Sequence, residues 1–277
     1  MSIITLITDF VYKDQFVAQM KGEIYSNNPE SQVVDISHNI SPFNIMEAAY
    51  VLENSYKSFP ENTIHIIDVD SEKNKEKKHI IVKLDNHYFI TSDNGIMSIL
   101  SQNINYQEIY EISILNELKP MQSSLKTFSK VACHLSMGGK PEIVGKKINN
   151  LKNVKNLNPF VNSENTQIIS SVIYIDHFGN VITNIKKSFF EEIGKGRKFE
   201  ISARNYKFNK IYSSYSDIIN FNLSEDQRSD EGKALIIFNS NNYLQISIYR
   251  SNPENVGTAA TLLGLKIYDS VSIIFSR

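Results

Sequence analysis

Residues 3–36 read IITLITDFVYKDQFVAQMKGEIYSNNPESQVVDI, and this stretch decides the fold. Its first six residues are an apolar run of strand length. Residues 14–27 then space their apolar side chains along one helical face, which Asn28-Pro29 ends, and residues 32–36 are apolar again. An apolar run, a helical period and a second apolar run predict a strand, a helix and a second strand.

The same alternation continues as far as residue 69. Ser41-Pro42 predicts the start of a second helix, and residues 63–69 predict a third strand. Strand–helix–strand–helix–strand is typical of βαβ units, so we expect an α/β domain with a largely parallel sheet that helices cover on both faces. Residues 79–84 and 87–91 predict a hairpin across Asp85-Asn86.

The pattern changes in the second half of the chain. Residues 131–137 predict one more helix, and residues 148–167 are polar, rich in Asn and weakly periodic, which favours a linker. Short alternating strands follow, at residues 168–175, 198–203, 234–238, 243–248 and 270–275. Short strands without long helices favour a small antiparallel sandwich or barrel. We therefore expect an N-terminal α/β domain over residues 1–160 and a smaller C-terminal antiparallel β-barrel over residues 161–277.

Composition excludes several classes of protein. Of the 277 residues, 41% are hydrophobic and 21% are charged, which is typical of a globular chain. A net charge of -1 gives no basic field for nucleic acid or an anionic membrane, and no window reaches the ~20 apolar residues of a membrane span. The single cysteine, Cys133, excludes an intrachain disulfide and a thiolate metal site. The opening MSIITLITDF does not have the pattern of a signal peptide, so we expect a cytoplasmic protein.

Three aspartates follow predicted strands, at the edge where open α/β sheets bind ligands. Asp9 follows the first strand and either accepts hydrogen bonds from paired hydroxyls, as on a ribose, or caps the next helix. Asp68 and Asp70 end the third strand and either serve as a base or cation ligands, or form a polar strand exit with one solvated carboxylate. None of the six histidines has the paired spacing of a zinc site, and we predict no bound metal.

Longer segments carry a resemblance to a known family. They are ITDFVYKDQFVAQMKGEIYSNNP (7–29), VVDISHNISPFNIMEAAYVL (33–52), SDNG (92–95), IDHFGNVITNI (175–185) and NSNNYLQISIYR (239–250). Together they resemble the S-adenosylmethionine (SAM) hydroxide adenosyltransferases, relatives of the SAM-dependent chlorinase and fluorinase. The resemblance extends from residue 3 to about residue 275.

The resemblance implies an architecture and a substrate. The family has an α/β N-terminal domain, a C-terminal β-barrel, and a trimer with SAM at the junction between neighbouring subunits. SAM is the substrate, and no separate cofactor is implied. By resemblance, Asp9 would hold the ribose diol. Asp176, Phe178 and Asn180 of the neighbouring chain would hold the methionine or adenosine end. Ser240 and Tyr243, in the segment 239–250, would also contact SAM.

The catalytic groups are only partly retained. Relatives that use water carry an Asp in a Val-Asp-Pro-Gly-Val-Gly loop, an Arg seven positions later, and a His. Here Asp70 matches the Asp, Lys77 stands in place of the Arg, and Ser123 stands in place of the His. Residues 71–74 are Ser-Glu-Lys-Asn instead of Pro-Gly-Val-Gly, and Ser124 stands in place of a Gly.

The resemblance therefore implies hydrolysis of SAM to adenosine and L-methionine, with a weakened catalytic set of Asp70, Lys77 and Ser123. The alternative is a non-catalytic protein that binds SAM or adenosine. A halogenase is disfavoured, because the chlorinase and fluorinase relatives carry a Tyr at the position of Asp70. A carboxylate there would repel a halide by about 4 kcal/mol at about 4 Å and an effective dielectric constant of about 20.

Overall fold

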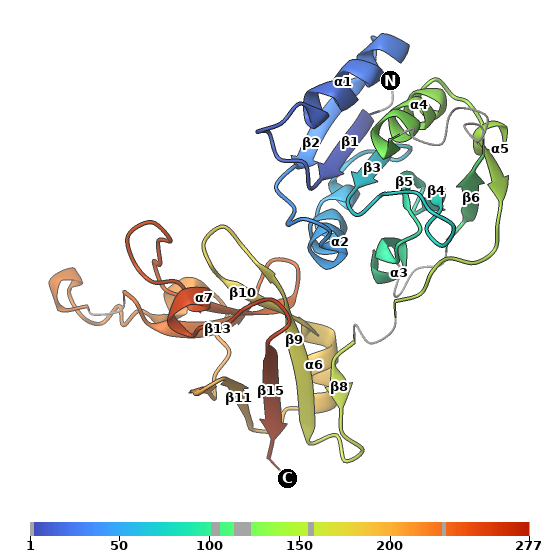
Figure 1. The fold of residues 1–277 in the computed structure, drawn as a ribbon. Coiled ribbons are helices and arrows are strands. Elements are labelled where there is room, and N and C mark those ends of the chain that lie inside the picture. The colour runs from blue at the N-terminus through green and yellow to red at the C-terminus, as the bar shows by residue number, and fades with distance from the viewer. Residues whose placement is uncertain (1–2, 101–105, 114–122, 155–157, 229–230, 277) are drawn as a thin grey trace. The chain divides into compact units, whose positions relative to one another are not determined.

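The computed structural model describes residues 3–100, 106–113, 123–154, 158–228 and 231–276. The chain divides into two compact units, Met1–Lys155 and Asn156–Arg277 (Figure 1). Within the described part of the chain, no helix is long and apolar enough to cross a membrane.

The N-terminal unit is built on a seven-stranded mixed sheet. Its strands lie in the order β2-β1-β3-β5-β4-β6-β7. Pairs β1–β2, β1–β3 and β3–β5 are parallel, and the remaining pairs are antiparallel. The strands are β1 (Ile3–Thr8), β2 (Gln32–Ser37), β3 (Ile64–Asp68), β4 (His79–Leu84), β5 (His87–Ser92), β6 (Glu108–Ile112) and β7 (Gly145–Lys147). The predicted α/β fold is confirmed, with the parallel pairing confined to one half of the sheet.

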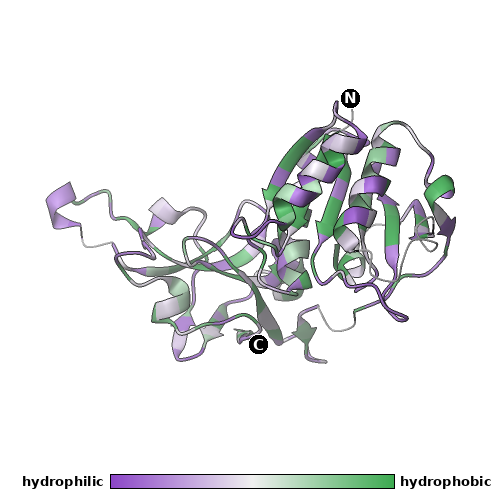
Figure 2. Ribbon diagram, turned by 45° about the horizontal axis from the view of Figure 1, so that its top comes forward, coloured by the Kyte–Doolittle hydropathy of each residue, from purple (hydrophilic) through white to green (hydrophobic). Residues whose placement is uncertain are grey.

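Helices cover both faces of this sheet. Helices α1 (Phe16–Asn27) and α4 (Ser124–Ser136) pack on one face, in a core with Ile4, Leu6 and Ile66. Helices α2 (Ile45–Glu53) and α3 (Ile96–Leu100) pack on the other, in a core with Ile7, Ile67 and Phe89. Because the central strands are buried on both faces, they are largely apolar along their length rather than at every second residue, and β3 and β5 add a few buried polar side chains; Figure 2 shows these strands as mostly hydrophobic. Short elements η1 (Tyr56–Ser58) and α5 (Pro141–Val144) complete the unit.

Local sequence explains most of these elements, and two predicted helix starts are wrong. The β4–β5 hairpin is confirmed, since Asp85 and Asn86 have φ values of 48° and 61°, as a type I′ turn requires. Helix α2 begins at Ile45 rather than at Ser41-Pro42, because Asn44 caps it by accepting a hydrogen bond from the backbone of Glu47. Helix α4 begins seven residues before the predicted start at 131.

The segment after β7 belongs to the N-terminal unit as far as residue 154. We expected residues 148–167 to be a linker, but Ile148 and Leu151 pack against the core beside α2 and α3. The backbone N–H of Lys152 donates to Asp93 Oδ1 at 2.8 Å. Part of the predicted linker, residues 155–157, lies outside the described residues.

The C-terminal unit is an antiparallel, barrel-like sheet. Its strands lie in the order β12-β11-β15-β9-β10-β14-β13, with β8 paired to β9. Strand β9 pairs with β15 through its first half and with β10 through its second half, so one long strand joins the two parts of the sheet. The strands are β8 (Phe160–Val161), β9 (Gln167–Ile175), β10 (Val181–Lys186), β11 (Phe199–Ala203), β12 (Tyr206–Phe208), β13 (Ala234–Phe238), β14 (Tyr243–Ile248) and β15 (Ser270–Phe275).

The five predicted strands of this unit are confirmed within two residues, but β10 and the short strands β8 and β12 were not predicted. It follows β9 after a five-residue turn, and helix α6 (Lys187–Gly194) continues directly from its last residue. The remaining short elements are η2 (Tyr215–Ile218), η3 (Glu225–Gln227) and α7 (Ala259–Leu262).

Candidate active site

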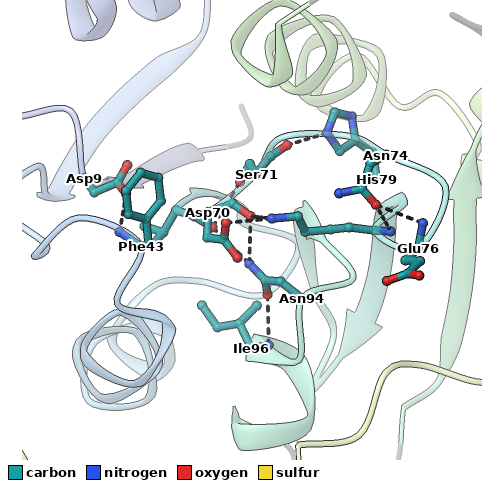
Figure 3. Close-up of polar contacts among 11 residues, drawn as sticks. Asp9, Phe43, Asp70, Ser71, Asn74, Glu76, His79, Asn94 and Ile96 are labelled. Atoms are coloured by element: carbon teal, nitrogen blue, oxygen red, sulfur yellow. Dashed lines mark hydrogen bonds and ion pairs between the residues drawn. The ribbon is translucent and has the colours of Figure 1, made fainter.

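Three polar residues lie at the edge of the sheet where the parallel strands end. Thr8 of β1 lies beside Asp68 of β3 in parallel register, so Asp9 and Asp70 follow their strands at the same edge of the sheet. Asn94 follows β5, the next parallel strand, at this edge. Figure 3 shows Asp9, Asp70 and Asn94 in this region. The edge therefore brings together Asp9 and Asp70, which the sequence placed after separate strands, and adds Asn94, which was not predicted there.

Asp70 and Lys77 form an ion pair. Lys77 Nζ donates to Asp70 Oδ1 at 2.6 Å and to the Asp70 carbonyl oxygen at 3.0 Å. Asn94 Nδ2 donates to the carbonyl oxygens of Val69 and Asp70, at 3.0 and 3.3 Å (Figure 3). The Asp70 backbone has a φ of 47°, in the left-handed region, and these contacts hold it there.

Asn74 explains how Lys77 returns to Asp70. Its Oδ1 accepts hydrogen bonds from the backbone N–H groups of Glu76 and Lys77, at 2.9 and 2.8 Å (Figure 3). An Asn side chain that caps the backbone two and three residues later closes a tight turn. The Ser-Glu-Lys-Asn loop thus brings a cation back to the aspartate by its own turn chemistry.

Asp9 holds a second loop at the same edge. Its Oδ2 accepts a hydrogen bond from the backbone N–H of Phe43 at 2.9 Å (Figure 3). The residue at the N-cap of α1 is Gln15, so the interpretation of Asp9 as a helix cap is wrong. Phe43 has a φ of 63° and its side chain is 74% exposed. Asp9 therefore fixes an exposed aromatic residue, and its Oδ1 oxygen is not used in that contact.

A partly buried network behind Asp9 was not predicted from the sequence. Thr8 Oγ1 lies 2.8 Å from His38 Nδ1, and His38 Nε2 lies 3.1 Å from Asp35 Oδ1. Lys21 and Tyr12 both donate to Asp35 Oδ2 at 2.6 Å. Burial alone would raise the pKa of Asp35, but the hydrogen bonds from Lys21, Tyr12 and His38 outweigh it and lower the pKa to about 2. This charged network braces the loops on either side of Asp9.

Asp68 differs from Asp70 in being fully buried. Burial raises its pKa to about 7, hydrogen bonds from Ser124 and Ser71 partly oppose that rise, and the charge of Asp9 adds to it. Asp68 is 1% exposed, so of the two aspartates at the end of β3 only Asp70 is accessible to solvent. Burial of this kind cannot be seen in the sequence, where the two aspartates alternate around Val69 like any polar strand exit.

Ser123 lies at the N-cap position of α4. Its backbone is extended, its side chain is exposed and makes no capping hydrogen bond, and its carbonyl accepts from the backbone of Thr127 at 3.3 Å. Ser124, the first residue of the helix, is half-buried and reaches Asp68. Of the three predicted catalytic residues, the structure joins Asp70 and Lys77 directly and places Ser123 at the start of α4.

In the C-terminal unit, Asp176 shapes the turn between β9 and β10. Its Oδ1 accepts from the backbone of Phe178 and Asn180, both at 2.9 Å, and its Oδ2 accepts from Asn180 Nδ2 at 2.8 Å. Gly179 has a φ of 72°, and a Cβ there would overlap the side chain of Thr258. This turn presents Phe178, which is 60% exposed. The Asp176 carboxylate therefore orients the turn rather than pointing freely outward.

Ser240 and Tyr243 lie at the opposite end of β10 from this turn. Val181 of β10 pairs with Ile246, whereas Lys186 pairs with Tyr243. At about 3.3 Å per residue, five residues of strand separate the two ends by about 16 Å. Ser240 is exposed in the turn before β14, whereas Tyr243 is 6% exposed with Lys186 Nζ 4.9 Å from its ring centroid. The five predicted residues of this unit thus form two separate groups.

Sequence reasoning missed a serine beside the Asp176 turn. Ser251 Oγ donates to the carbonyl oxygen of Phe178 at 3.4 Å. Ser251 follows the last residue of the NSNNYLQISIYR segment, so only its position next to that segment could have indicated it. Among the residues that the structure describes, no three His, Cys, Asp or Glu side chains gather as a metal site.

Comparison with known proteins gives this geometry a context. Residues 4–145 match the SAM hydroxide adenosyltransferase N-terminal domain, and residues 170–272 match the C-terminal domain. The chain is 29% identical to the (R)-S-adenosyl-L-methionine hydrolase of Methanocaldococcus jannaschii, over 99% of this chain and 97% of that protein. It is 24% identical to the fluorinase of Nocardia brasiliensis, over 70% of this chain and 74% of that protein.

A solved structure agrees with the fold. An uncharacterized conserved protein from Thermotoga maritima superimposes with a TM-score of 0.80 at 28% sequence identity, covering 98% of this chain and 99% of that one. Both domains of one family are therefore present in sequence order. The chain belongs to the SAM hydroxide adenosyltransferase family.

Proposed function

We propose that this protein hydrolyses SAM to adenosine and L-methionine. The observation that carries the proposal is the Asp70 carboxylate, which Lys77 holds at 2.6 Å on the sheet edge that also carries Asp9. Displacement at C5′ of SAM expels a neutral thioether from a sulfonium, so the leaving group needs no acid. The site must orient a water molecule, exclude bulk water and accept a proton.

In this proposal each retained residue has one task. Asp70 accepts a hydrogen bond from the attacking water and directs its lone pair toward C5′. Lys77 fixes the carboxylate through both the side chain and the main chain of Asp70, and Ser123 lies at the start of α4 as a third polar group. Orientation of this kind is worth up to about 7–11 kcal/mol of barrier.

In this proposal, the N-terminal unit of one chain and the C-terminal unit of a neighbouring chain would supply the groups that bind the two ends of SAM. Asp9 Oδ1 would accept hydrogen bonds from the two ribose hydroxyls, since Asp9 Oδ2 already accepts one from the backbone N–H of Phe43. Phe178 is exposed for stacking and is held by the turn that Asp176 and Asn180 form. Ser240 and Tyr243 would contact the other end of SAM, because they lie at the opposite end of β10 from the Asp176 turn.

Water is favoured over a halide as the nucleophile. An unpaired carboxylate would repel a halide by about 4 kcal/mol at about 4 Å and an effective dielectric constant of about 20, and the Lys77 ammonium beside Asp70 offsets part of that repulsion. A water molecule, in contrast, can donate a hydrogen bond to the same oxygen. We therefore expect no 5′-halo-adenosine from SAM with chloride or fluoride.

The second candidate is a non-catalytic protein that binds SAM or adenosine. Lys77 favours this alternative, because an ammonium is a point charge without the two-pronged fork of a guanidinium, and here it also serves a main-chain carbonyl. A positioned acid–base group contributes about 10²–10⁴-fold to a rate, so a missing histidine could leave binding without turnover.

Incubation of the purified protein with SAM separates the two candidates. Adenosine and methionine, followed by chromatography, should form in equal amounts above a blank without protein. Asp70→Asn should abolish the formation of adenosine above the blank. Asp85→Asn, a matched change in the β4–β5 turn, should leave it unchanged. Heat on calorimetric titration with SAM but no adenosine would contradict hydrolysis and support the binding protein. Asp9→Ala should remove binding in either case.

We also propose a homotrimer in the cytoplasm. The trimer is what membership of the family implies when the C-terminal unit of a neighbour supplies Asp176, Phe178 and Asn180. A contact between two different surfaces of the same chain closes into a ring when the rotation permits. The cytoplasmic location is an expectation from the sequence alone.

A further inference from the structure

Asp68 is a buried carboxyl group for which the proposed mechanism has so far no task. It is the last residue of β3, and its side chain lies on the face that α1 and α4 cover, as those of Ile64 and Ile66 do. Only 1% of the residue is exposed. Its Oδ2 oxygen has no hydrogen-bond partner among the described residues. A buried carboxyl oxygen without a partner is costly, so it calls for a functional explanation.

Asp68 belongs to a row of buried polar residues across the sheet. In register, Thr8 of β1 lies beside Asp68, and Ser92 of β5 lies beside His79 of β4. The row two residues deeper on the same face is entirely apolar: Leu6, Ile66, Ile90 and Ile81. Ser92 is 0% exposed, and in the described part of the chain its Oγ also lacks a partner. The core thus ends in a polar row at the site edge.

Ser124 connects this row with the surface. It is the first residue of α4, it is half-buried, and its hydroxyl hydrogen-bonds to Asp68. Ser71, 7% exposed, is the second hydroxyl that reaches Asp68, and its Oγ lies 3.2 Å from the carbonyl oxygen of Val69. A serine hydroxyl donates one hydrogen bond and accepts up to two, so Ser124 can pass a proton inward while accepting one from outside.

The charges around Asp68 favour a group that titrates near neutral pH. Burial is the dominant cause of its raised pKa of about 7, and Asp9 at the end of β1 adds to it. His79 on β4 has a pKa lowered by burial to about 4 and is therefore neutral in this range. On the loop after β3, the ammonium of Lys77 is held by Asp70, and from α4 the neutral Ser124 faces Asp68.

We propose, building on the hydrolase function above, that Asp68 accepts the proton of the attacking water through the Ser124 hydroxyl. The water oxygen bonds to C5′ while the C5′–S bond breaks and its electron pair stays on sulfur, giving the methionine thioether. One water proton passes to Ser124 Oγ as the Ser124 proton passes to the Asp68 carboxylate. The resulting carboxylic acid returns the proton to solvent by the same route, so atoms and charge balance.

This division of tasks gives Asp70 and Asp68 different roles in the proposed reaction. Asp70 Oδ1 already accepts a hydrogen bond from the Lys77 ammonium at 2.6 Å, so the task of Asp70 is to orient the water. Asp68 has no cationic partner. Asp68 contacts the water only through Ser124 and is therefore a positioning residue. In this proposal it takes over the role of the family histidine, whose position Ser123 occupies here.

The pH dependence of kcat/KM tests the proposal. For the wild-type protein, hydrolysis of SAM should increase with pH through a limb centred near pH 7, because the acceptor must be ionised. Asp68→Asn should lower kcat about 10²–10⁴-fold and remove that limb, with the Kd for adenosine unchanged. Ser124→Ala should remove the same limb with the carboxyl in place. Ser129→Ala, the matched change further along α4, should leave rate and profile unchanged.

The possible results distinguish the inference from the function on which it rests. If wild-type protein hydrolyses SAM and both variants keep the limb near pH 7, the proton route is overturned and the hydrolase function stands. If wild-type protein binds adenosine but forms none from SAM, the function fails and the route with it. Ser124→Ala alone decides the question if Asp68→Asn does not fold, since a half-buried hydroxyl at the first turn of a helix is a mild change.

Discussion

His65 should lower the stability of the N-terminal unit in acid, and its replacement should remove the His65 share of that sensitivity. The residue is 0% exposed, with Thr5 Oγ1 2.7 Å from Nδ1 and His87 Nδ1 3.2 Å from Nε2. Its ring stacks on Phe89 with centroids 4.9 Å apart. Burial, and secondarily the neighbouring His87, lower its pKa from 6.5 to about 3.

The pKa difference gives the size and the sign of the effect. The unfolded chain takes up a proton on His65 below pH 6.5, but the folded chain does so only near pH 3. The stability is therefore complete above pH 6.5 and falls by about 1.4 kcal/mol per pH unit below it. At pH 5 the loss is about 2 kcal/mol. Protonation of His79 also lowers the stability in acid, whereas protonation of Asp68 raises it. Both residues are present in wild-type protein and variant, so their contributions drop out of the difference.

Urea titrations of wild-type protein and His65→Phe at pH 7.5, 6 and 5 measure the effect. At pH 7.5 the variant should be less stable by about 2–3 kcal/mol, because Thr5 and His87 lose their partner. At pH 5 that gap should have closed by about 2 kcal/mol. Thr5→Val is the control, since it removes the same hydrogen bond but keeps the imidazole, and its deficit should be the same at each pH. A constant gap for His65→Phe would refute the reasoning.

Three further predictions concern the site and the assembly. The double variant Lys77→Arg with Ser123→His should hydrolyse SAM faster, because a guanidinium group and an imidazole are then added beside the retained Asp70 carboxylate. An unchanged rate of adenosine formation, measured by chromatography, would contradict this. Gly179→Ala should lower stability and weaken SAM binding more than Gly196→Ala, since both have φ above 70° but only at Gly179 would the Cβ overlap a neighbour; equal melting temperatures would contradict it. Light scattering at micromolar concentration should give three times the mass of one chain, and a single-chain mass would exclude the trimer.

Much of the fold was determined by the sequence alone. Apolar runs and helical periods are local, so the strands of the N-terminal sheet's parallel half and five strands of the C-terminal unit were predicted within two residues. Asp85-Asn86 also predicts its hairpin, because two consecutive residues with positive φ are a property of the turn itself. The family resemblance likewise depended only on the order of short segments.

Element boundaries were less predictable, because they depend on which residues are covered by distant parts of the chain. Helix α4 begins at Ser124 since Leu125 and Phe128 are buried against the sheet, and the apolar period alone did not extend that far. Strand β10 was missed because its six residues continue directly into α6, which leaves no turn between two patterns.

The chemistry of the site was decided by the tertiary structure. Asp68 and Asp70 are both aspartates at the end of one strand, and the sequence does not distinguish them. The fold buries Asp68 beneath the start of α4, which raises its pKa to about 7, and leaves Asp70 half-buried beside Lys77. Desolvation and Coulomb energy depend on neighbours in space. Ser124 lies 56 positions from Asp68 along the chain, and only folding makes them neighbours.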